Sequence, residues 1–267
     1  MNLLTRTFSR AGQQFVEFAV HLARICQLCA QTLVWIFIGP LRGKKIRWHL
    51  TFIQIVRIGV NSVPITGIII FCVGLIIAMQ SAYQLERFGA TIYVADLVGV
   101  SMTRELGPLI TAIVIAGRSG SAIAAEIGTM KVAEEIDALK TMAMNPLGYL
   151  VVPRTLAMLI VLPCLTILAD MLGILGGMTL AVVNLKIPFI AYFNQTASAI
   201  LMKDFLTGLV KSFFFAIIIS QIGVYQGFSV SGGAEGVGKS TTASVVSSIF
   251  LIILADLLFT MLFYSTL

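Results

Sequence analysis

Four charged residues stand in stretches of the sequence that are otherwise apolar: the adjacent Arg104 and Glu105, then Lys211 and Asp256. A charge at the centre of a lipid bilayer costs from about 2.5 to more than about 10 kcal/mol, so such a residue faces a cavity, water or an opposite charge. Neighbouring side chains on a helix point about 100° apart. Arg104 and Glu105 therefore cannot neutralise each other on one face. At least one is expected to meet another helix or a ligand, with Lys211 and Asp256 as the natural partners.

Two interpretations of these charges remain open. They could surround a polar chamber that accepts a charged cargo, or they could form an ion-pair network that only sets the register of the helices. We favour the chamber. A gradient-driven secondary transporter or channel for a small polar solute could use the same charges as a proton relay. We find no pairing of a nucleophile with a base, so no catalytic residue is assigned.

The elements that position these charges are predicted to be membrane-spanning helices. Of the 267 residues, 58% are apolar and 11% are charged, and the mean hydropathy is +0.98. Soluble domains carry roughly 25% charged residues. The composition excludes a disordered chain, a nucleic-acid-binding tail and almost any water-soluble globule. Because about 20 apolar residues cross a bilayer, we predict an all-α protein with five spans. The spans are expected at about residues 58–85, 93–124, 155–183, 206–227 and 243–265.

Residues 1–50 are expected to form an amphipathic helix lying in the membrane interface, followed by a basic juxtamembrane segment. Apolar residues recur at helical spacing from Phe8 to Cys29, which is typical of an interfacial helix. The uncharged segment 25–41 leaves a short span as the alternative. Residues 1–57 hold eight of the 18 basic residues and one of the 12 acidic ones. Basic segments stay on the cytoplasmic side, so the N-terminus is predicted to be cytoplasmic and the C-terminus periplasmic.

A further helix is predicted over residues 125–143, between the second and third spans. It has an apolar side and a charged side and ends at Met144-Asn145-Pro146. A short amphipathic helix held between two spans is suited to transmit movement from a partner protein, whereas a solvated connector is the alternative. The residues proposed for this coupling are Glu126, Lys131, Glu134, Glu135, Asp137 and Leu139.

Residues 233–240, GAEGVGKS, match the nucleotide-binding pattern G-x-x-x-x-G-K-S. A P-loop needs a strand before it and a helix after it, so that backbone amides surround the phosphates. Here one membrane span precedes the match and another follows it. We interpret the match as a coincidence within a Ser/Gly-rich loop over residues 228–242. The two histidines and the single Cys26-x-x-Cys29 do not complete a metal site, so no metal and no bound cofactor are expected.

Two segments of the sequence resemble the MlaE/YrbE permease family. One reads TRELGPLITAIVIAGRSGSAIAAEIGTMKVAEEIDAL and is followed by MNPLGYLVVPR; the other reads SGGAEGVGKSTTASVV. The resemblance implies that residues 51–267 form a permease domain. It implies the membrane subunit of a bacterial ABC transporter that moves phospholipids between the inner and outer membranes and maintains outer-membrane lipid asymmetry. The family more often has Arg at the position of Lys239, which supports a coincidental P-loop match.

The resemblance also implies partners. It implies a homodimer in the bacterial inner membrane and a cytoplasmic ATPase that uses ATP and Mg²⁺ and contacts residues 125–143. It further implies a periplasmic lipid-binding subunit with an MCE domain and often a small STAS-domain protein, but no nucleic acid. Lipid would lie at the dimer interface near Arg104, Glu105, Lys211 and Asp256. We expect Arg104 or Lys211 to attract the lipid phosphate, with the two carboxylates balancing these cations.

Overall fold

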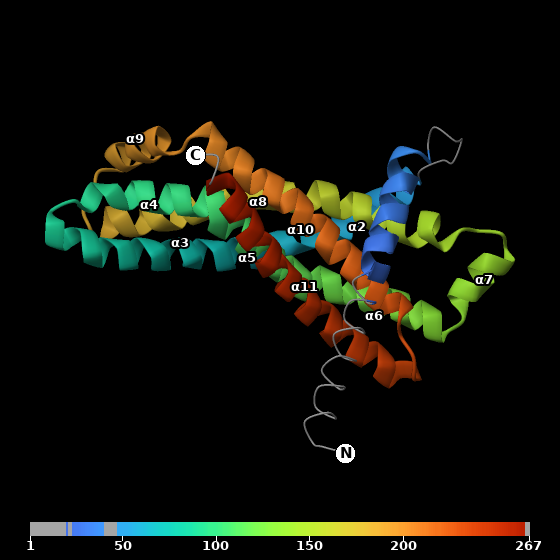
Figure 1. Cartoon of the computed structure of the whole chain (residues 1–267). Coiled ribbons are helices and arrows are strands. Elements are labelled where there is room, and N and C mark those ends of the chain that lie inside the picture. Colours follow the sequence, from blue (N-terminus) through green and yellow to red (C-terminus); the bar gives the residue numbers. More distant parts are fainter. Residues whose placement is uncertain (1–19, 21–22, 40–46, 265–267) are drawn as a thin grey trace, which may run out of the picture.

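The computed structural model describes residue 20, residues 23–39 and residues 47–264 (Figure 1). Helices and short connections make up this part of the chain, and no strand occurs in it. All backbone groups of a helix are bonded within the segment, which is what a lipid environment requires. Five helical segments are long and apolar enough to cross a membrane, so the prediction of an all-α protein with five spans is confirmed. They cover Trp48–Phe88, Thr91–Val132, Leu147–Val183, Met202–Phe228 and Gly233–Phe263.

Most of these spans are built from more than one helix. The first joins α2 (Trp48–Ile58) to α3 (Val63–Leu85) through the short turn η2 (Val60–Ser62). The third consists of η7 (Leu147–Val151) and α8 (Val152–Val183). The shorter helix α9 (Phe189–Ala199) follows, and α10 (Met202–Phe228) and α11 (Gly233–Tyr264) form the last two spans. The second span contains α4 (Val94–Ser101), η5 (Met102–Leu106), α5 (Gly107–Ile115), η6 (Ala116–Gly120) and α6 (Ser121–Val132).

The second span is interrupted twice by single π-helical turns, η5 and η6. Pro108, one residue into α5, has no N–H and cannot continue the regular ladder. The backbone N–H of Gly107 instead bonds to the carbonyl of Met102, five residues earlier. Turns of this kind re-aim side chains and occur often at functional sites. The first contains Arg104 and Glu105, and the second contains Arg118.

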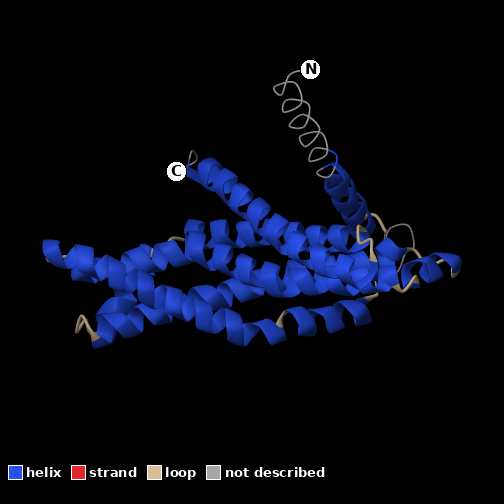
Figure 2. Cartoon of the chain, turned by 90° about the horizontal axis from the view of Figure 1, so that it is seen from below, coloured by secondary structure: helices blue, strands red, loops and turns tan. Residues whose placement is uncertain are grey.

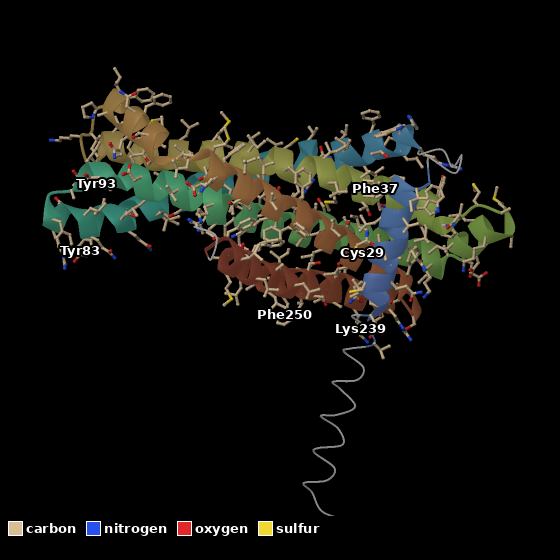
Figure 3. The ribbon with its side chains drawn as sticks, turned by 45° about the horizontal axis from the view of Figure 1, so that its top comes forward. Cys29, Phe37, Tyr83, Tyr93, Lys239 and Phe250 are labelled. Atoms are coloured by element: carbon tan, nitrogen blue, oxygen red, sulfur yellow. The ribbon has the colours of Figure 1, made fainter. Side chains whose placement is uncertain are left out.

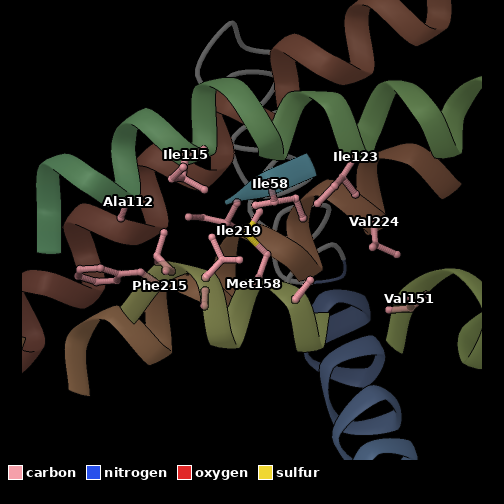
Figure 4. Close-up of a cluster of buried hydrophobic side chains, with 14 of the residues drawn as sticks. Ile58, Ala112, Ile115, Ile123, Val151, Met158, Phe215, Ile219 and Val224 are labelled. Carbon is pink, nitrogen blue, oxygen red and sulfur yellow. The ribbon is translucent and has the colours of Figure 1, made fainter. Parts of the chain in front are cut away.

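Small residues bring the helices close together. A Cβ on Gly74 of α3 would collide with the backbone of Gly173 of α8, and a Cβ on Gly176 would collide with the backbone of Phe71. Such faces drive association in lipid, where packing rather than the hydrophobic effect holds helices together. Further along, α5, α6, α8 and α10 enclose the largest apolar cluster. Figure 4 shows its members converging from these helices, among them Ile115, Met158, Phe215 and Ile219.

The last span is the least buried of the five. Figure 2 shows that α11 starts against the other helices and diverges from them toward its C-terminal end. Its first half is packed through small side chains, since Ser240, Ser244 and Ser248 are buried. Its second half exposes large apolar side chains, including Ile253 and Leu258. Phe250 likewise points away from the bundle in Figure 3.

Near the N-terminus, the structure has a short apolar helix over Ala23–Phe37. It packs on the bundle, because Thr32 is fully buried and its hydroxyl lies 3.4 Å from Oε1 of Gln221 on α10. Cys29 and Phe37 mark this helix in Figure 3. Its place in the membrane interface stays a prediction. Residues 1–19 and 21–22 of the predicted interfacial segment, and 40–46 of the basic segment, lie outside the described residues.

Two predictions about connections are wrong. The Ser/Gly-rich segment 228–242 is a loop only over residues 229–232, because α11 already begins at Gly233. Its serines and glycines form a packing face rather than a loop. The segment 125–143 is not one helix: α6 ends at Val132, and α7 (Glu135–Thr141) follows. Glu134 separates them with a left-handed backbone, φ 59°, which ends a helix as a C-terminal glycine does.

Candidate functional site

Lys211 is the centre of a closed polar cluster inside the membrane-spanning region. It lies on α10 and is fully buried. Its Nζ lies 2.5 Å from Oε2 of Glu105 and 2.8 Å from Oδ1 of Asp256. It also donates a hydrogen bond to Oγ1 of Thr260 at 2.9 Å. Glu105 and Thr260 accept hydrogen bonds from the ammonium group, whereas Asp256 forms an ion pair with it.

Three elements meet in this cluster. Glu105 comes from the π turn η5, Lys211 from α10, and Asp256 and Thr260 from successive turns of α11. The hydroxyl of Thr260 donates to Oε1 of Glu105 at 2.9 Å while it accepts from Lys211, which closes the ring. Residues four apart lie on the same helix face, so Asp256 and Thr260 both reach Lys211. The cluster ties α11 to the bundle where that helix diverges.

The cluster carries more acid than base. Two carboxylates share one ammonium group, a formal charge of −1 when all three groups are ionised. The side chain of Glu105 is 30% exposed and that of Asp256 is 14% exposed, whereas Lys211 has no exposed surface. The cation is therefore enclosed, and the exposed part of the three charged side chains belongs to the two acids. Because Lys211 has no exposed surface, its ammonium group is not accessible to the phosphate of a lipid.

Arg104 lies apart from this ring. Its guanidinium is 3.9 Å from Oδ1 of Asp204, near the start of α10. Asp204 also accepts the backbone N–H of Leu201 through Oδ2 at 3.2 Å and so caps α10. A cavity of about 260 Å³ adjoins this pair. It is lined by Arg104, Lys203, Asp204, Leu206, Thr207, Val210 and Phe263.

The predicted set of four charges is thus divided. Glu105, Lys211 and Asp256 are brought together, while Arg104 faces a separate cavity. With Lys203 this cavity has two cations against the one carboxylate of Asp204, and the rest of its lining is largely apolar. An amphipathic cavity of this kind fits an anionic group joined to an apolar chain.

Sequence reasoning missed three members of the site: Thr260, Asp204 and Lys203. The spacing Asp256-x-x-x-Thr260 could have revealed the first, because it puts the hydroxyl one turn after a buried acid. Asp204 lies two residues before the predicted span 206–227, where an acid is expected to cap the free N–H groups at the start of a helix. No pattern in the sequence indicated that Lys203 lines the same cavity as Arg104.

Comparison with known proteins agrees with this architecture. The family model for the MlaE permease matches residues 51–262. The chain belongs to the MlaE permease family. It is 41% identical to a probable ABC transporter permease protein of Rickettsia felis over 262 residues, covering 98% of this chain and 99% of that relative. A probable ABC transporter permease protein of Synechocystis is 39% identical over 221 residues, covering 83% of this chain and 84% of the relative.

A more distant relative comes from a plant. The Arabidopsis thaliana chloroplastic protein TRIGALACTOSYLDIACYLGLYCEROL 1 is 35% identical over 224 residues, covering 84% of this chain and 64% of that protein. As an MlaE permease, the chain is the multi-pass membrane component of an ABC transporter. Membership of this family implies an ATPase partner. The relatives' names do not favour the gradient-driven alternative.

The segment predicted to couple the MlaE permease to its partner has two structural roles. The half-buried Glu126 forms ion pairs with the exposed Arg57 and the buried Arg154, each at 3.0 Å. Lys131 donates to the backbone carbonyl of Phe228 at the end of α10. These two residues therefore hold the end of α6 in place.

The rest of the predicted coupling segment faces outward. Glu134, Glu135 and Asp137 are exposed, and Leu139 packs against the apolar cluster beneath α7. Lys140 forms a hydrogen bond and ion pair with Asp137 at 2.7 Å, which lowers the pKa of that carboxyl group. The helix α7 thus presents a negatively charged surface while it remains anchored to the core.

The P-loop match of the permease lies on the first turns of α11. Residues 233–240 are helical, and α10 rather than a strand precedes them. Lys239 pairs with Glu235 of the same helix at 2.7 Å, and the hydroxyl of Ser240 donates to the carbonyl of Gln226 at 2.6 Å. The backbone geometry is therefore that of a packed helix rather than of a phosphate-binding loop.

Proposed function

We propose that this MlaE permease moves phospholipids between the bacterial inner membrane and the periplasm or outer membrane, and so maintains outer-membrane lipid asymmetry. The observation that carries the proposal is the cavity beside Arg104, where cationic side chains adjoin apolar walls. A phosphodiester would accept charge-assisted hydrogen bonds from Arg104 and Lys203. The name of the Arabidopsis relative refers to a glycolipid, which is consistent with a lipid cargo.

The buried ring of Glu105, Lys211, Asp256 and Thr260 has a positioning role in this proposal. Glu105 precedes Leu106 in the same π turn that presents Arg104 to the cavity. Fixing Glu105 therefore fixes the direction of Arg104. The acyl chains lie along the exposed apolar side chains of the second half of α11. Two copies of the chain enclose the lipid, since one diverging helix forms only one wall.

The assembled transporter has further components in this proposal. A cytoplasmic ATPase, using ATP and Mg²⁺, binds the surface of α7 with its acids Glu134, Glu135 and Asp137. The elements η5, α5, η6 and α6 form one continuous span. A movement of α7 is therefore transmitted through this span to Arg104. The N-terminus is cytoplasmic and the C-terminus periplasmic, where an MCE-domain subunit receives the lipid. A small STAS-domain protein accompanies the ATPase.

Site-specific photocrosslinking tests the lipid position. Val210 lines the Arg104 cavity and is 38% exposed, whereas Ile76 on α3 is 54% exposed and does not belong to the lining of that cavity. A photoreactive amino acid at either position, in cells grown with radioactive phosphate, should capture phospholipid. Arg104→Gln should reduce capture at Val210 and leave capture at Ile76 unchanged. Equal capture at Val210 with and without Arg104 would contradict the proposal.

A further inference from the structure

A second basic pocket lies toward the other end of the bundle. It measures about 220 Å³ and is lined by residues of α2, η2, η6 and α6. Its polar lining consists of Gln54, Arg57, Asn61, Arg118, Ser119 and Glu126. Figure 1 shows α2 and α6 at the end of the molecule that bears α7, away from α9. Arg104 and Arg118 belong to the same span and are 14 residues apart, about 20 Å along a helix.

The positive charge of this pocket is not fully balanced. Arg118 lies in the π turn η6, is half-buried, and donates to the hydroxyl of Ser62. Within the described residues, no carboxylate lies at ion-pair distance from Arg118. Glu126 is the one acid of the lining. Its Oε1 pairs with Arg57, which also lines the pocket, and its Oε2 pairs with the buried Arg154. Two guanidinium groups thus pair with this carboxylate, and Arg118 adds a further positive charge to the pocket lining.

We propose that this pocket binds the phosphate group of an anion, with Arg118 and Arg57 as the cationic ligands. A guanidinium carries five N–H donors, so the contacts to Ser62 and Glu126 leave several directed at the pocket. The side-chain amides of Gln54 and Asn61 supply neutral donors at its rim. Glu126 does not repel the anion strongly, because Arg154 compensates its charge from the buried side.

A phospholipid headgroup fits the surroundings of the pocket. Ile53, Val56 and Val60 of the first span expose about half of their surface beside Arg57, where acyl chains would lie. The pocket and the Arg104 cavity would then hold headgroups at two levels of the same span, one nearer each surface of the membrane. The lipid identity rests on the proposed function, but the phosphate site itself does not. Inorganic phosphate shares the chemistry and is the alternative source.

Native mass spectrometry of the full-length protein can count the bound ligands. The probes are dihexanoylphosphatidylglycerol, dihexanoylglycerol, which lacks the phosphate, and inorganic phosphate. We expect two phosphatidylglycerol molecules for each chain and no saturable binding of dihexanoylglycerol. Arg118→Gln should remove one of the two, with at least a tenfold loss of affinity at that site. Saturable binding of inorganic phosphate that is also lost in Arg118→Gln would support the site and identify a free anion as its ligand.

Three further variants make the result decisive. Gln54→Glu adds a carboxylate at the rim without removing Arg118, and it should cause the same loss even if Arg118→Gln fails to assemble. Arg87→Gln removes an equal charge from the external end, where Arg87 contacts Tyr83, and should leave both sites intact. Arg104→Gln should remove only the other molecule. The wild-type protein could instead bind a single molecule that is lost in Arg118→Gln but not in Arg104→Gln. That result would refute the proposed transport cavity and would still support the phosphate site in this pocket. Unchanged binding in both Arg118→Gln and Gln54→Glu would overturn the inference.

Discussion

Replacing Lys211 by Met should destabilise the protein more than any other single change in the buried ring. The substitution leaves Glu105 and Asp256 close together without a cation. Breaking a buried ion pair by removing one partner costs about 3–5 kcal/mol. Because Glu105 is 30% exposed and remains partly hydrated, we take the lower end, about 3 kcal/mol. For a chain of this size that corresponds to a fall in Tm of about 6–12 °C.

Thermal unfolding in mild detergent measures this effect. Lys203→Met is the matched control, since Lys203 lies near the start of the same helix and is exposed. It should change the free energy of unfolding by no more than about 0.5 kcal/mol. The triple variant Glu105→Gln, Lys211→Met, Asp256→Asn removes all three charges. It should recover most of the lost stability, because apolar or neutral groups often replace a buried ion network without penalty.

Either of two results would refute this reasoning. If Lys211→Met unfolds at the wild-type temperature, the ring does not hold α11 to the bundle. If the triple variant is less stable than the single one, the remaining carboxylates are not the source of the instability. Loss of lipid transport with normal stability in Lys211→Met would instead indicate that the ring acts directly on the cargo.

Three further tests address separate parts of the structure. Gly74→Ala should lower the free energy of unfolding by about 1–3 kcal/mol, because the added Cβ would collide with the backbone of α8. A Cβ on Gly117 has no neighbouring atom within 4 Å, so Gly117→Ala should be tolerated. Thermal unfolding of the two variants measures the difference. Glu126→Gln should cost about 3 kcal/mol, because it leaves the buried Arg154 without a counter-charge, and wild-type stability would show that water compensates that cation. Lys239→Ala should leave ATP hydrolysis by the assembled transporter unchanged, since Lys239 pairs within its own helix; a loss of hydrolysis would mean that the P-loop match is functional.

The membrane architecture was predictable because its signal is strong and local. Uncharged stretches as long as a bilayer is thick specify spans almost regardless of what surrounds them. The ring partners Lys211 and Asp256 were predictable for the same reason, because a charge in a span needs a counter-charge. The partner of Arg104 was not. It pairs with Asp204 at the start of α10, and Asp204 lies outside the predicted span 206–227.

The two wrong connections have a common cause. Ser and Gly are weak helix formers in water, so the segment around Ser240 resembled a loop. In this protein the same small side chains allow α11 to approach α10 closely, as in the hydrogen bond from Ser240 to Gln226. The break at Glu134 was equally hidden. A left-handed backbone is rare for a residue other than glycine, and no feature of the local sequence indicates it.

The most direct test of the account is the transfer of a fluorescent phospholipid out of vesicles that contain the transporter assembled with its ATPase. Transfer should require ATP and should fall about tenfold in Arg104→Gln, the effect of losing one charge-assisted hydrogen bond. It should be normal in Arg87→Gln, which removes the same charge away from the cavity. Transfer that proceeds equally without ATP, or equally in Arg104→Gln, would contradict the proposal that Arg104 receives the lipid phosphate in an ATP-driven permease.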